Sequence, residues 1–104
     1  MWRNLWRTIS RESQLAKIKY TESYLKRAKK FVKRHPELIG QYEKTLQLLE
    51  LNPFHPSLRL HKLKGHLSEI YSVSINISYR ITLEFIIEDD VIIPINVGSH
   101  REVY

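Results

Sequence analysis

The sequence predicts an α+β fold, in which an antiparallel sheet carries a helical hairpin on one face and the elements follow the order β-α-α-β-β-β. Two observations predict it. Apolar residues recur at helical spacing through two successive segments, residues 21–34 and 36–51. Apolar and polar residues then alternate with a period of two from residue 71 to residue 85, and a further apolar run covers 91–97. Helices followed by strands favour a sheet with its helices gathered on one side.

The first two elements are a short strand and a basic helix. Apolar and basic residues alternate over 15–20, which predicts the strand. Thr21 offers an N-cap hydroxyl, and the helix that follows should run to about Arg34. Its expected buried stripe consists of Tyr24, Leu25, Ala28, Phe31 and Val32.

A second helix should begin at Pro36, where the missing N–H costs nothing, and stop before Asn52. Residues 53–65 are rich in proline, histidine and lysine, and we expect an irregular, functional loop there. The expected buried stripe of this helix consists of Leu38, Ile39, Tyr42, Leu46 and Leu49.

A hairpin and a last strand complete the predicted sheet. The hairpin strands cover 71–76 and 79–85, and the last strand covers 91–97, with Pro94 tolerable only where no ladder N–H is needed. Arg80 is out of phase with its apolar neighbours, so it should project to the same side as Ser72 and Ser74. We expect this polar face to be open and to carry the function.

Composition limits the class of protein. A chain of 104 residues forms one domain, which we place at 15–104, with residues 1–14 as an N-terminal extension. The net charge of +6 favours a polyanionic or acidic partner, and residues 1–34 hold eleven Lys and Arg against two acidic residues. The absence of cysteine excludes disulfides, thiolate zinc sites and a cysteine nucleophile. No apolar run approaches the roughly 20 residues of a membrane span, and we expect a soluble, cytoplasmic protein.

Four segments carry a resemblance to a known family: KRAKKFVKRHPEL, LRLHKLKGHLSEIYSV, SYRITLEF and the terminal GSHREVY. In this order they resemble the RelE/ParE toxin superfamily, in particular the RelE- and YafQ-like mRNA endonucleases, over residues 17–104. The resemblance implies the RelE-like microbial RNase fold and the toxin role in a type II toxin–antitoxin system. It also implies cleavage of mRNA on the ribosome by attack of the ribose 2′-hydroxyl on the adjacent phosphorus, without a metal or other cofactor.

Such a reaction needs a base, a cationic clamp for the phosphate and an acid. The resemblance assigns catalytic roles to His61, Arg80, His100 and Tyr104. His100 matches the catalytic histidine of YafQ-like toxins and is our choice for the general acid, and His61 suits the base. Arg80 matches the arginine of the family's YR strand motif and can grip two phosphate oxygens. Tyr104 matches the aromatic residue that closes the site.

Each residue also has a plain structural interpretation. His61 could be a surface histidine in a loop, and Tyr104 an anchor onto the core. Arg80 could form a cross-strand salt bridge with an acidic neighbour such as Glu84. The family pattern also places a histidine and an aspartate where this chain has Ser74 and Ser78, so which histidine is base and which is acid stays open.

Further cations are expected to bind RNA phosphates. On the first helix the charge run could equally be a solvated face, but a ribosome-bound protein gains affinity from it. The expected phosphate-binding residues are Lys62, Lys64, Arg101, Lys26, Lys30 and Lys33.

The resemblance also implies a cognate antitoxin as partner, besides mRNA on the ribosome. Two other functions remain open: a ParE-like toxin that poisons DNA gyrase by binding it, and an inactive RNA-binding relative. The other histidines are assigned to helix-end, loop and surface roles, because their spacing matches no zinc-ligand pair: His35, His55 and His66.

Overall fold

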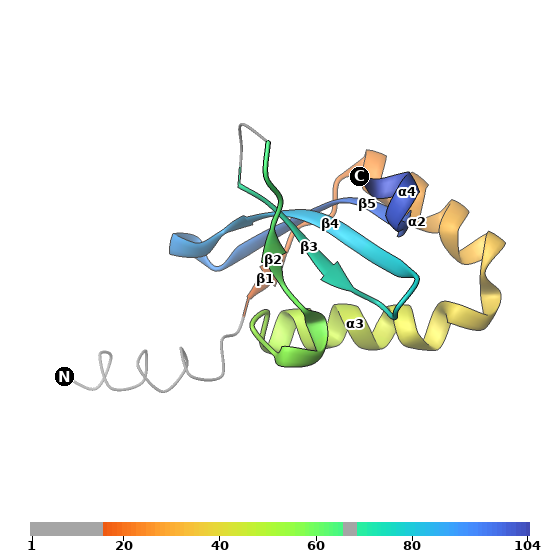
Figure 1. Ribbon diagram of the computed structural model, residues 1–104, viewed down its shortest axis with the longest axis horizontal. Helices are drawn as coiled ribbons and strands as arrows, with labels where there is room; N and C mark the ends of the chain where they lie inside the picture. Colours follow the sequence, from red (N-terminus) through yellow and green to blue (C-terminus); the bar gives the residue numbers. More distant parts are fainter. Residues whose placement is uncertain (1–15, 66–68) are drawn as a thin grey trace.

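A computed structural model describes residues 16–65 and 69–104 (Figure 1). The predicted N-terminal extension, Leu15 and His66 lie outside these residues. The described elements are β1 (Lys17–Ile18), α2 (Glu22–Arg34), a 3₁₀ turn η1 (Pro36–Leu38), α3 (Ile39–Leu51), a second 3₁₀ turn η2 (Pro56–Leu58), β2 (His61–Lys62), β3 (Ile70–Ser74), β4 (Tyr79–Ile86), a third 3₁₀ turn η3 (Ile87–Asp89), β5 (Val91–Ser99) and α4 (His100–Val103).

The predicted α+β fold is confirmed, with additions. The strands form one sheet in the order β1-β5-β4-β3-β2, and only the β1–β5 pair is parallel. The segment that we expected to be irregular contains β2, which pairs with β3. The last strand extends to Ser99, two residues further than predicted, and the chain ends in the short helix α4.

Local sequence features set the start of α2 as expected, whereas the helix predicted to begin at Pro36 starts there as the 3₁₀ turn η1 and becomes α-helical only at Ile39. The Thr21 hydroxyl accepts a hydrogen bond from the Tyr24 N–H, which caps α2. His35 ends α2, and Pro36 starts the next turn without needing its missing N–H. The two helices therefore follow each other closely and form the predicted hairpin.

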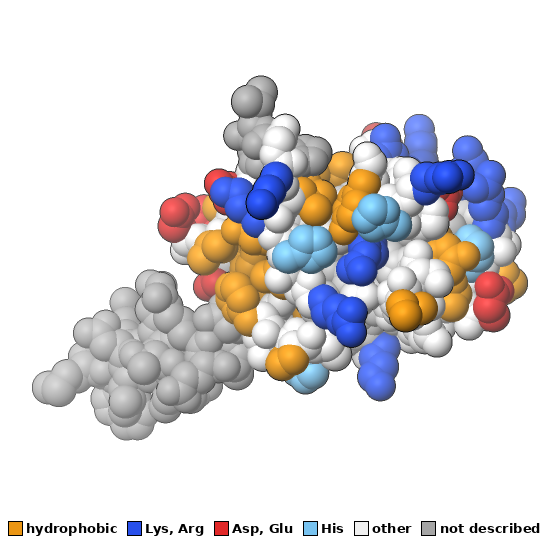
Figure 2. Space-filling view, in the orientation of Figure 1, with side chains coloured by type: hydrophobic (Ala, Val, Ile, Leu, Met, Phe, Trp, Pro, Cys, Tyr) orange, Lys and Arg blue, Asp and Glu red, His pale blue; other side chains and the backbone are white. Residues whose placement is uncertain are grey.

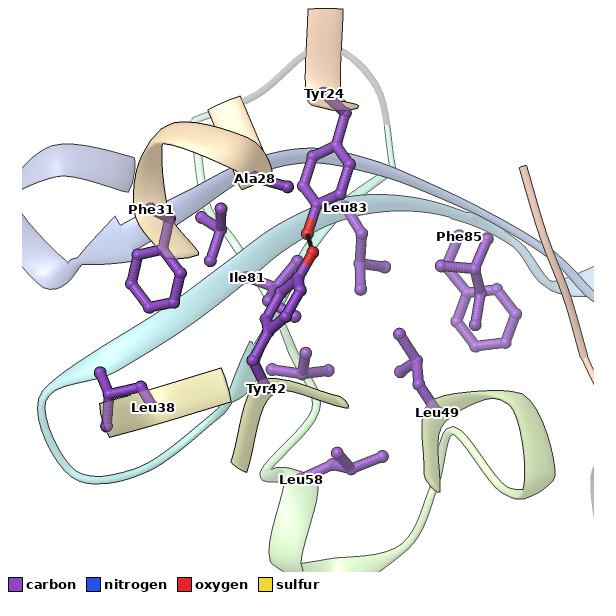
Figure 3. Close-up of a cluster of buried hydrophobic side chains, with 13 residues drawn as sticks. Tyr24, Ala28, Phe31, Leu38, Tyr42, Leu49, Leu58, Ile81, Leu83 and Phe85 are labelled. Atoms are coloured by element: carbon purple, nitrogen blue, oxygen red, sulfur yellow. Dashed lines mark hydrogen bonds between the residues drawn. The ribbon is translucent and has the colours of Figure 1, made fainter. Parts of the chain in front are cut away.

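The hydrophobic core lies between this hairpin and one face of the sheet (Figure 3). The hydroxyls of Tyr24 and Tyr42 share a hydrogen bond of 2.7 Å inside it, and burial raises the pKa of both phenols. Two residues predicted to be buried are exposed. Leu25 is 51% exposed and Ile39 is 36% exposed, because each lies at the edge of its helix's apolar stripe.

Pro94 lies at an irregular position of the sheet, as its missing N–H requires. It is opposite Leu83, where the register of β4 and β5 shifts. β1 pairs only with Val91 and Ile92, so Pro94 is beyond the end of that strand. Within the described residues, no helix is long and apolar enough to cross a membrane.

Candidate active site

A row of polar side chains crosses the sheet on the face opposite the core. His61 on β2 pairs with Ser72 on β3, Ser72 with Thr82 on β4, and Thr82 with Asn96 on β5. Residues paired in this way project to the same face. Figure 2 shows histidine, lysine and arginine side chains gathered over the strands on the face in view. The phase predicted for this face is therefore right.

The expectation that this face is open is wrong in part. Ser72 is fully buried, and Ser74 and Thr82 are buried as well. The reason is α4, which packs on β4 and β5 and brings the C-terminal residue Tyr104 over the sheet. The site is therefore a partly covered surface.

Arg80 lies on the same face, in the next row along the strands. It pairs with Ser74 on one side and with Gly98 on the other. At about 3.3 Å per residue, its Cα lies about 7 Å along β4 from Thr82. Its Nη1 is buried and, within the described residues, has no hydrogen-bond partner. No salt bridge joins Arg80 to Glu84 in that part of the chain, so the ion pair considered as an alternative does not form.

Tyr104 connects three of the polar groups. Its hydroxyl donates a hydrogen bond to Ser72 Oγ and lies 3.5 Å from His61 Nε2. Its ring packs edge-on against the ring of His100, with the ring centroids 4.2 Å apart. Three of the four predicted catalytic residues, His61, His100 and Tyr104, are thus brought together directly.

The backbone before β2 orients His61. Arg59 adopts the left-handed conformation (φ 50°) after the turn η2. Its carbonyl oxygen lies 3.0 Å from His61 Nδ1. A carbonyl can only accept, so in the neutral imidazole this contact places the proton on Nδ1 and leaves the Nε2 lone pair free, facing Tyr104.

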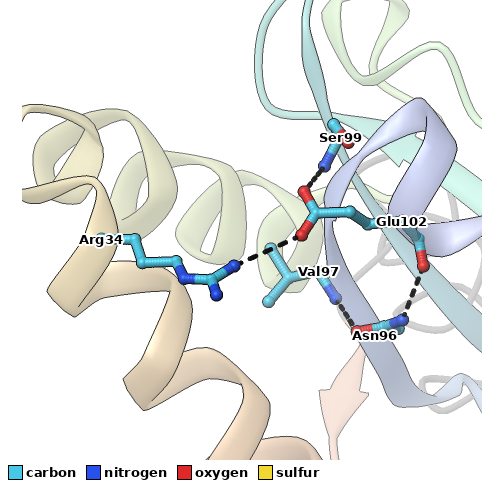
Figure 4. Close-up of polar contacts among 5 residues, drawn as sticks. All are labelled: Arg34, Asn96, Val97, Ser99 and Glu102. Carbon is cyan, nitrogen blue, oxygen red and sulfur yellow. Dashed lines mark hydrogen bonds and ion pairs between the residues drawn. The ribbon is translucent and has the colours of Figure 1, made fainter.

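A set of contacts to Glu102 holds α4 in place (Figure 4). Glu102 Oε1 accepts a hydrogen bond of 2.9 Å from the Ser99 N–H, and the two residues form a capping box. Glu102 Oε2 lies 3.8 Å from Nη1 of Arg34 on α2, and the Glu102 carbonyl accepts from Asn96 Nδ2 at 3.3 Å. The Ser99 N–H is the main reason that the pKa of Glu102 is lowered.

The three cations predicted to flank the site lie on different elements and do not share one face of the sheet. Lys62 pairs with Tyr71, so it projects to the other face of the sheet from His61, and its ammonium binds Glu69 at 2.9 Å. This hydrogen bond raises the pKa of Lys62. Lys64 is exposed in the turn after β2, so it does not continue a strand with Lys62. Arg101 is exposed on α4 beside the site.

The cations of α2 form a basic surface at the edge of the candidate site. Lys26, Lys30 and Lys33 are exposed and line a shallow groove of about 390 Å³ together with Arg27 and Lys29. Lys30 also borders a groove of about 210 Å³ that reaches Glu102 on α4. The basic surface of α2 is therefore continuous with the edge of the candidate site.

The remaining sequence positions of interest have structural partners. Ser74 Oγ donates to the Asn76 carbonyl at 2.7 Å, and Ser78 lies in the β3–β4 turn, where its N–H donates to the Asn76 side chain. His35 ends α2 and packs between Phe31 and Tyr79. His55 caps the turn η2. No group of three or more His, Cys, Asp or Glu in 16–65 and 69–104 could hold a metal ion.

Sequence comparison alone finds no relative. No protein-family model matches the chain. No curated protein matches it significantly.

Solved structures do match. A metal-bound toxin from Helicobacter pylori is similar with a TM-score of 0.64 and 21% identity, covering 86% of this chain and 100% of that one. The Escherichia coli DinJ–YafQ toxin–antitoxin complex gives a TM-score of 0.69 at 15% identity, with 86% and 97% covered. An archaeal RelE–RelB complex from Pyrococcus horikoshii gives 0.60 at 19% identity, with 81% and 93% covered. The chain therefore shares the fold of these toxins, which is the fold that the resemblance of its sequence motifs implies.

Proposed function

We propose that this chain is the toxin of a type II toxin–antitoxin pair and that it cleaves mRNA on the ribosome. The observation that carries the proposal is the meeting of His61, Tyr104 and His100 on the sheet face that also presents Arg80. These are the groups needed to move two protons and to bind a phosphate. The fold supports the toxin class, and the site supports the reaction.

His61 is the general base in this proposal. Its Nδ1–H is directed at the Arg59 carbonyl, so the Nε2 lone pair is available to a substrate. Nε2 takes the proton of the ribose 2′-hydroxyl while the 2′-oxygen attacks phosphorus. The contact between His61 Nε2 and the Tyr104 hydroxyl is long, at 3.5 Å. The ribose 2′-hydroxyl can therefore replace Tyr104 as the partner of Nε2.

Arg80 binds the phosphate as its charge grows in the transition state. A buried guanidinium nitrogen without a hydrogen-bond partner is costly, and a phosphate oxygen is a suitable acceptor for it. The planar guanidinium can contact two phosphate oxygens at once. Arg101, exposed on α4, adds positive charge to the helix that packs on β4 and β5.

His100 is the general acid. As the bond between phosphorus and the 5′-oxygen breaks, protonated His100 gives its proton to that oxygen, and the products are a 2′,3′-cyclic phosphate and a 5′-hydroxyl. The Tyr104 ring restricts the orientation of the imidazole. Tyr104 itself can stack on a base or orient the phosphate.

The proposed partners are an antitoxin protein and ribosome-bound mRNA, both in the cytoplasm. Two of the similar structures are toxin–antitoxin complexes, one with DinJ and one with RelB. The excess of basic residues suits an acidic antitoxin segment as well as RNA. The exposed cations Lys26, Lys30 and Lys33 would supply nonspecific affinity for ribosomal RNA.

The test is induced expression in a bacterial host, with growth followed and mRNA 5′ ends mapped. We expect growth arrest with cuts phased to the reading frame, and we expect both to vanish when His100→Ala is combined with Arg80→Ala. Lys44→Ala, at an exposed position of α3, is the control and should behave as wild type. Growth arrest without cuts would contradict the endonuclease and favour gyrase poisoning, which a gyrase pull-down would then identify.

A further inference from the structure

The helix α4 carries His100 and is followed directly by Tyr104, yet it is only four residues long. Helices of this length do not form in isolation, because nucleation costs more than one turn of hydrogen bonds returns. The position of α4 must therefore come from contacts outside its own backbone. These contacts decide where the two aromatic side chains of the site lie.

Most of the polar contacts come from Glu102. Its carboxylate caps the helix through the Ser99 N–H, and its other oxygen faces Arg34 on α2. Its carbonyl accepts from Asn96 on β5. One residue thus joins α4 to its own N-terminus, to the last strand and to the end of α2.

Gly98 leaves room for the side chain of Glu102 because it has no side chain of its own. A Cβ at position 98 would lie 3.1 Å from both Cβ and Oε1 of Glu102, closer than most Cβ contacts in proteins. The side chain of Glu102 therefore lies flat against the backbone of β5 at Gly98. Gly98 is paired with Arg80, so the contact is next to the proposed phosphate clamp.

We propose that Glu102 is a positioning residue. Its packing against Gly98 fixes α4, so that Tyr104 reaches Ser72 and His100 faces the substrate. Glu102 need not touch RNA, since its carboxylate is held by Ser99 and Arg34. The capping oxygen carries the effect, because the Arg34 contact is exposed and 3.8 Å long. The inference rests on the proposed function in one respect, which is that mRNA cleavage is the reaction whose rate depends on the position of α4.

The test uses the full chain and two readouts, one of which needs no RNA. The first readout is the NMR contact between the His100 and Tyr104 rings, together with the hydrogen bond from Tyr104 to Ser72. Glu102→Gln retains an oxygen for the Ser99 N–H and should preserve both. Glu102→Ala removes it and should abolish both, while Glu43→Ala, at an exposed position of α3, is the matched control.

The second readout is mRNA cleavage on ribosomes. Displacement of reacting groups by about 1 Å can cost about a hundredfold in rate, so we expect Glu102→Ala to lower kcat about ten- to a hundredfold. KM should change by less than about threefold, because the phosphate clamp and the basic helix remain. Glu102→Gln should restore most of kcat.

Gly98→Ala tests the same packing contact by changing the partner of Glu102. The added methyl group has to displace Glu102 by a few tenths of an ångström, so we expect a weakened ring contact and a kcat between those of wild type and Glu102→Ala, in a chain that still folds by circular dichroism. The inference is wrong if Glu102→Ala keeps the ring contact and cleaves within about twofold of wild type. A wild-type chain that shows the ring contact without cleaving mRNA would instead refute the proposed function and leave the role of Glu102 standing.

Discussion

The hydroxyl of Tyr104, the last residue, donates a hydrogen bond to Ser72, a fully buried side chain on β3, which lies between β4 and β2. The end of the chain is thus anchored on the face of the sheet that carries His61 and Arg80. Tyr104 is 47% exposed, so it can contact a ligand while its hydroxyl is held. The anchoring hydrogen bond and the proposed ligand contact thus belong to one side chain.

The first prediction separates these two roles of Tyr104. Tyr104→Phe keeps the ring and removes the hydrogen bond to Ser72, which should cost about 1 kcal/mol of unfolding free energy. We expect cleavage to fall further than stability alone explains, because the ring is no longer held beside His61. Urea unfolding and single-turnover cleavage measure the two effects. Ser72→Ala removes the same bond from the other side and should match Tyr104→Phe; full activity in both would show that the bond is only structural.

The second prediction concerns the effect of Arg80 on the stability of the fold. Its buried Nη1 has no hydrogen-bond partner in the described part of the chain, so Arg80→Met, which keeps much of the length and apolar stem, should leave stability unchanged or raise it by about 1 kcal/mol. Cleavage should fall about a hundred- to a thousandfold, the usual effect of losing a group that stabilises charge in the transition state. Thermal unfolding and a cleavage assay check the pair of outcomes. A strongly destabilised Arg80→Met would instead indicate a structural role for the guanidinium.

The sequence predicts the secondary structure well where local signals are strong. Thr21 marks the start of α2 through capping, and Pro36, with its fixed φ, marks the 3₁₀ turn η1 that leads into α3. The phase of Arg80 against Ser72 and Ser74 follows from the two-residue period of a strand alone. These are short-range effects, which a single chain reveals without knowledge of its tertiary contacts.

What the sequence does not predict depends on contacts between distant segments. The strand β2 has two residues, and only its pairing with β3 defines it. The burial of Ser72 requires Tyr104, which is 32 residues away. Leu25 is half exposed although its helical phase predicts burial, because periodicity cannot tell how wide a face the sheet covers.

The start of α4 could have been predicted from the sequence. Ser99 and Glu102 have the Ser-x-x-Glu spacing of a capping box, which marks a helix start. The contacts of Glu102 with Arg34 and Gly98 could not, because they depend on how α2 and β5 pack. The sequence thus holds a signal for the helix but not for its position.

The third prediction concerns the buried tyrosine pair and alkaline pH. Burial raises the pKa of Tyr24 and Tyr42 above the ordinary value of 10.0, so in the folded state both stay protonated where unfolded tyrosines ionise. Their contribution to stability is full below pH 10 and is lost as the pH rises above it. Urea unfolding across this range should show stability falling.

A double-mutant cycle checks the same pair. Tyr24→Phe and Tyr42→Phe should each cost about 1–3 kcal/mol, because each leaves a buried hydroxyl without its partner, and the double variant should cost less than their sum. Both changes should also weaken the alkaline loss of stability. Additive costs would contradict the coupling implied by the 2.7 Å contact.

The fourth prediction concerns the basic surface of α2. Changing Lys26, Lys30 and Lys33 to alanine together should weaken binding to RNA equally for different sequences, because phosphate contacts do not read bases. Each lost contact to single-stranded RNA should lower the slope of log affinity against log salt by about 0.7, so about 2 in total. The slope is measured from RNA affinities determined between about 50 and 200 mM salt. Lys44→Ala on α3 is the control. An unchanged slope would mean that these lysines are merely solvated, and a loss confined to one RNA sequence would mean that they read bases.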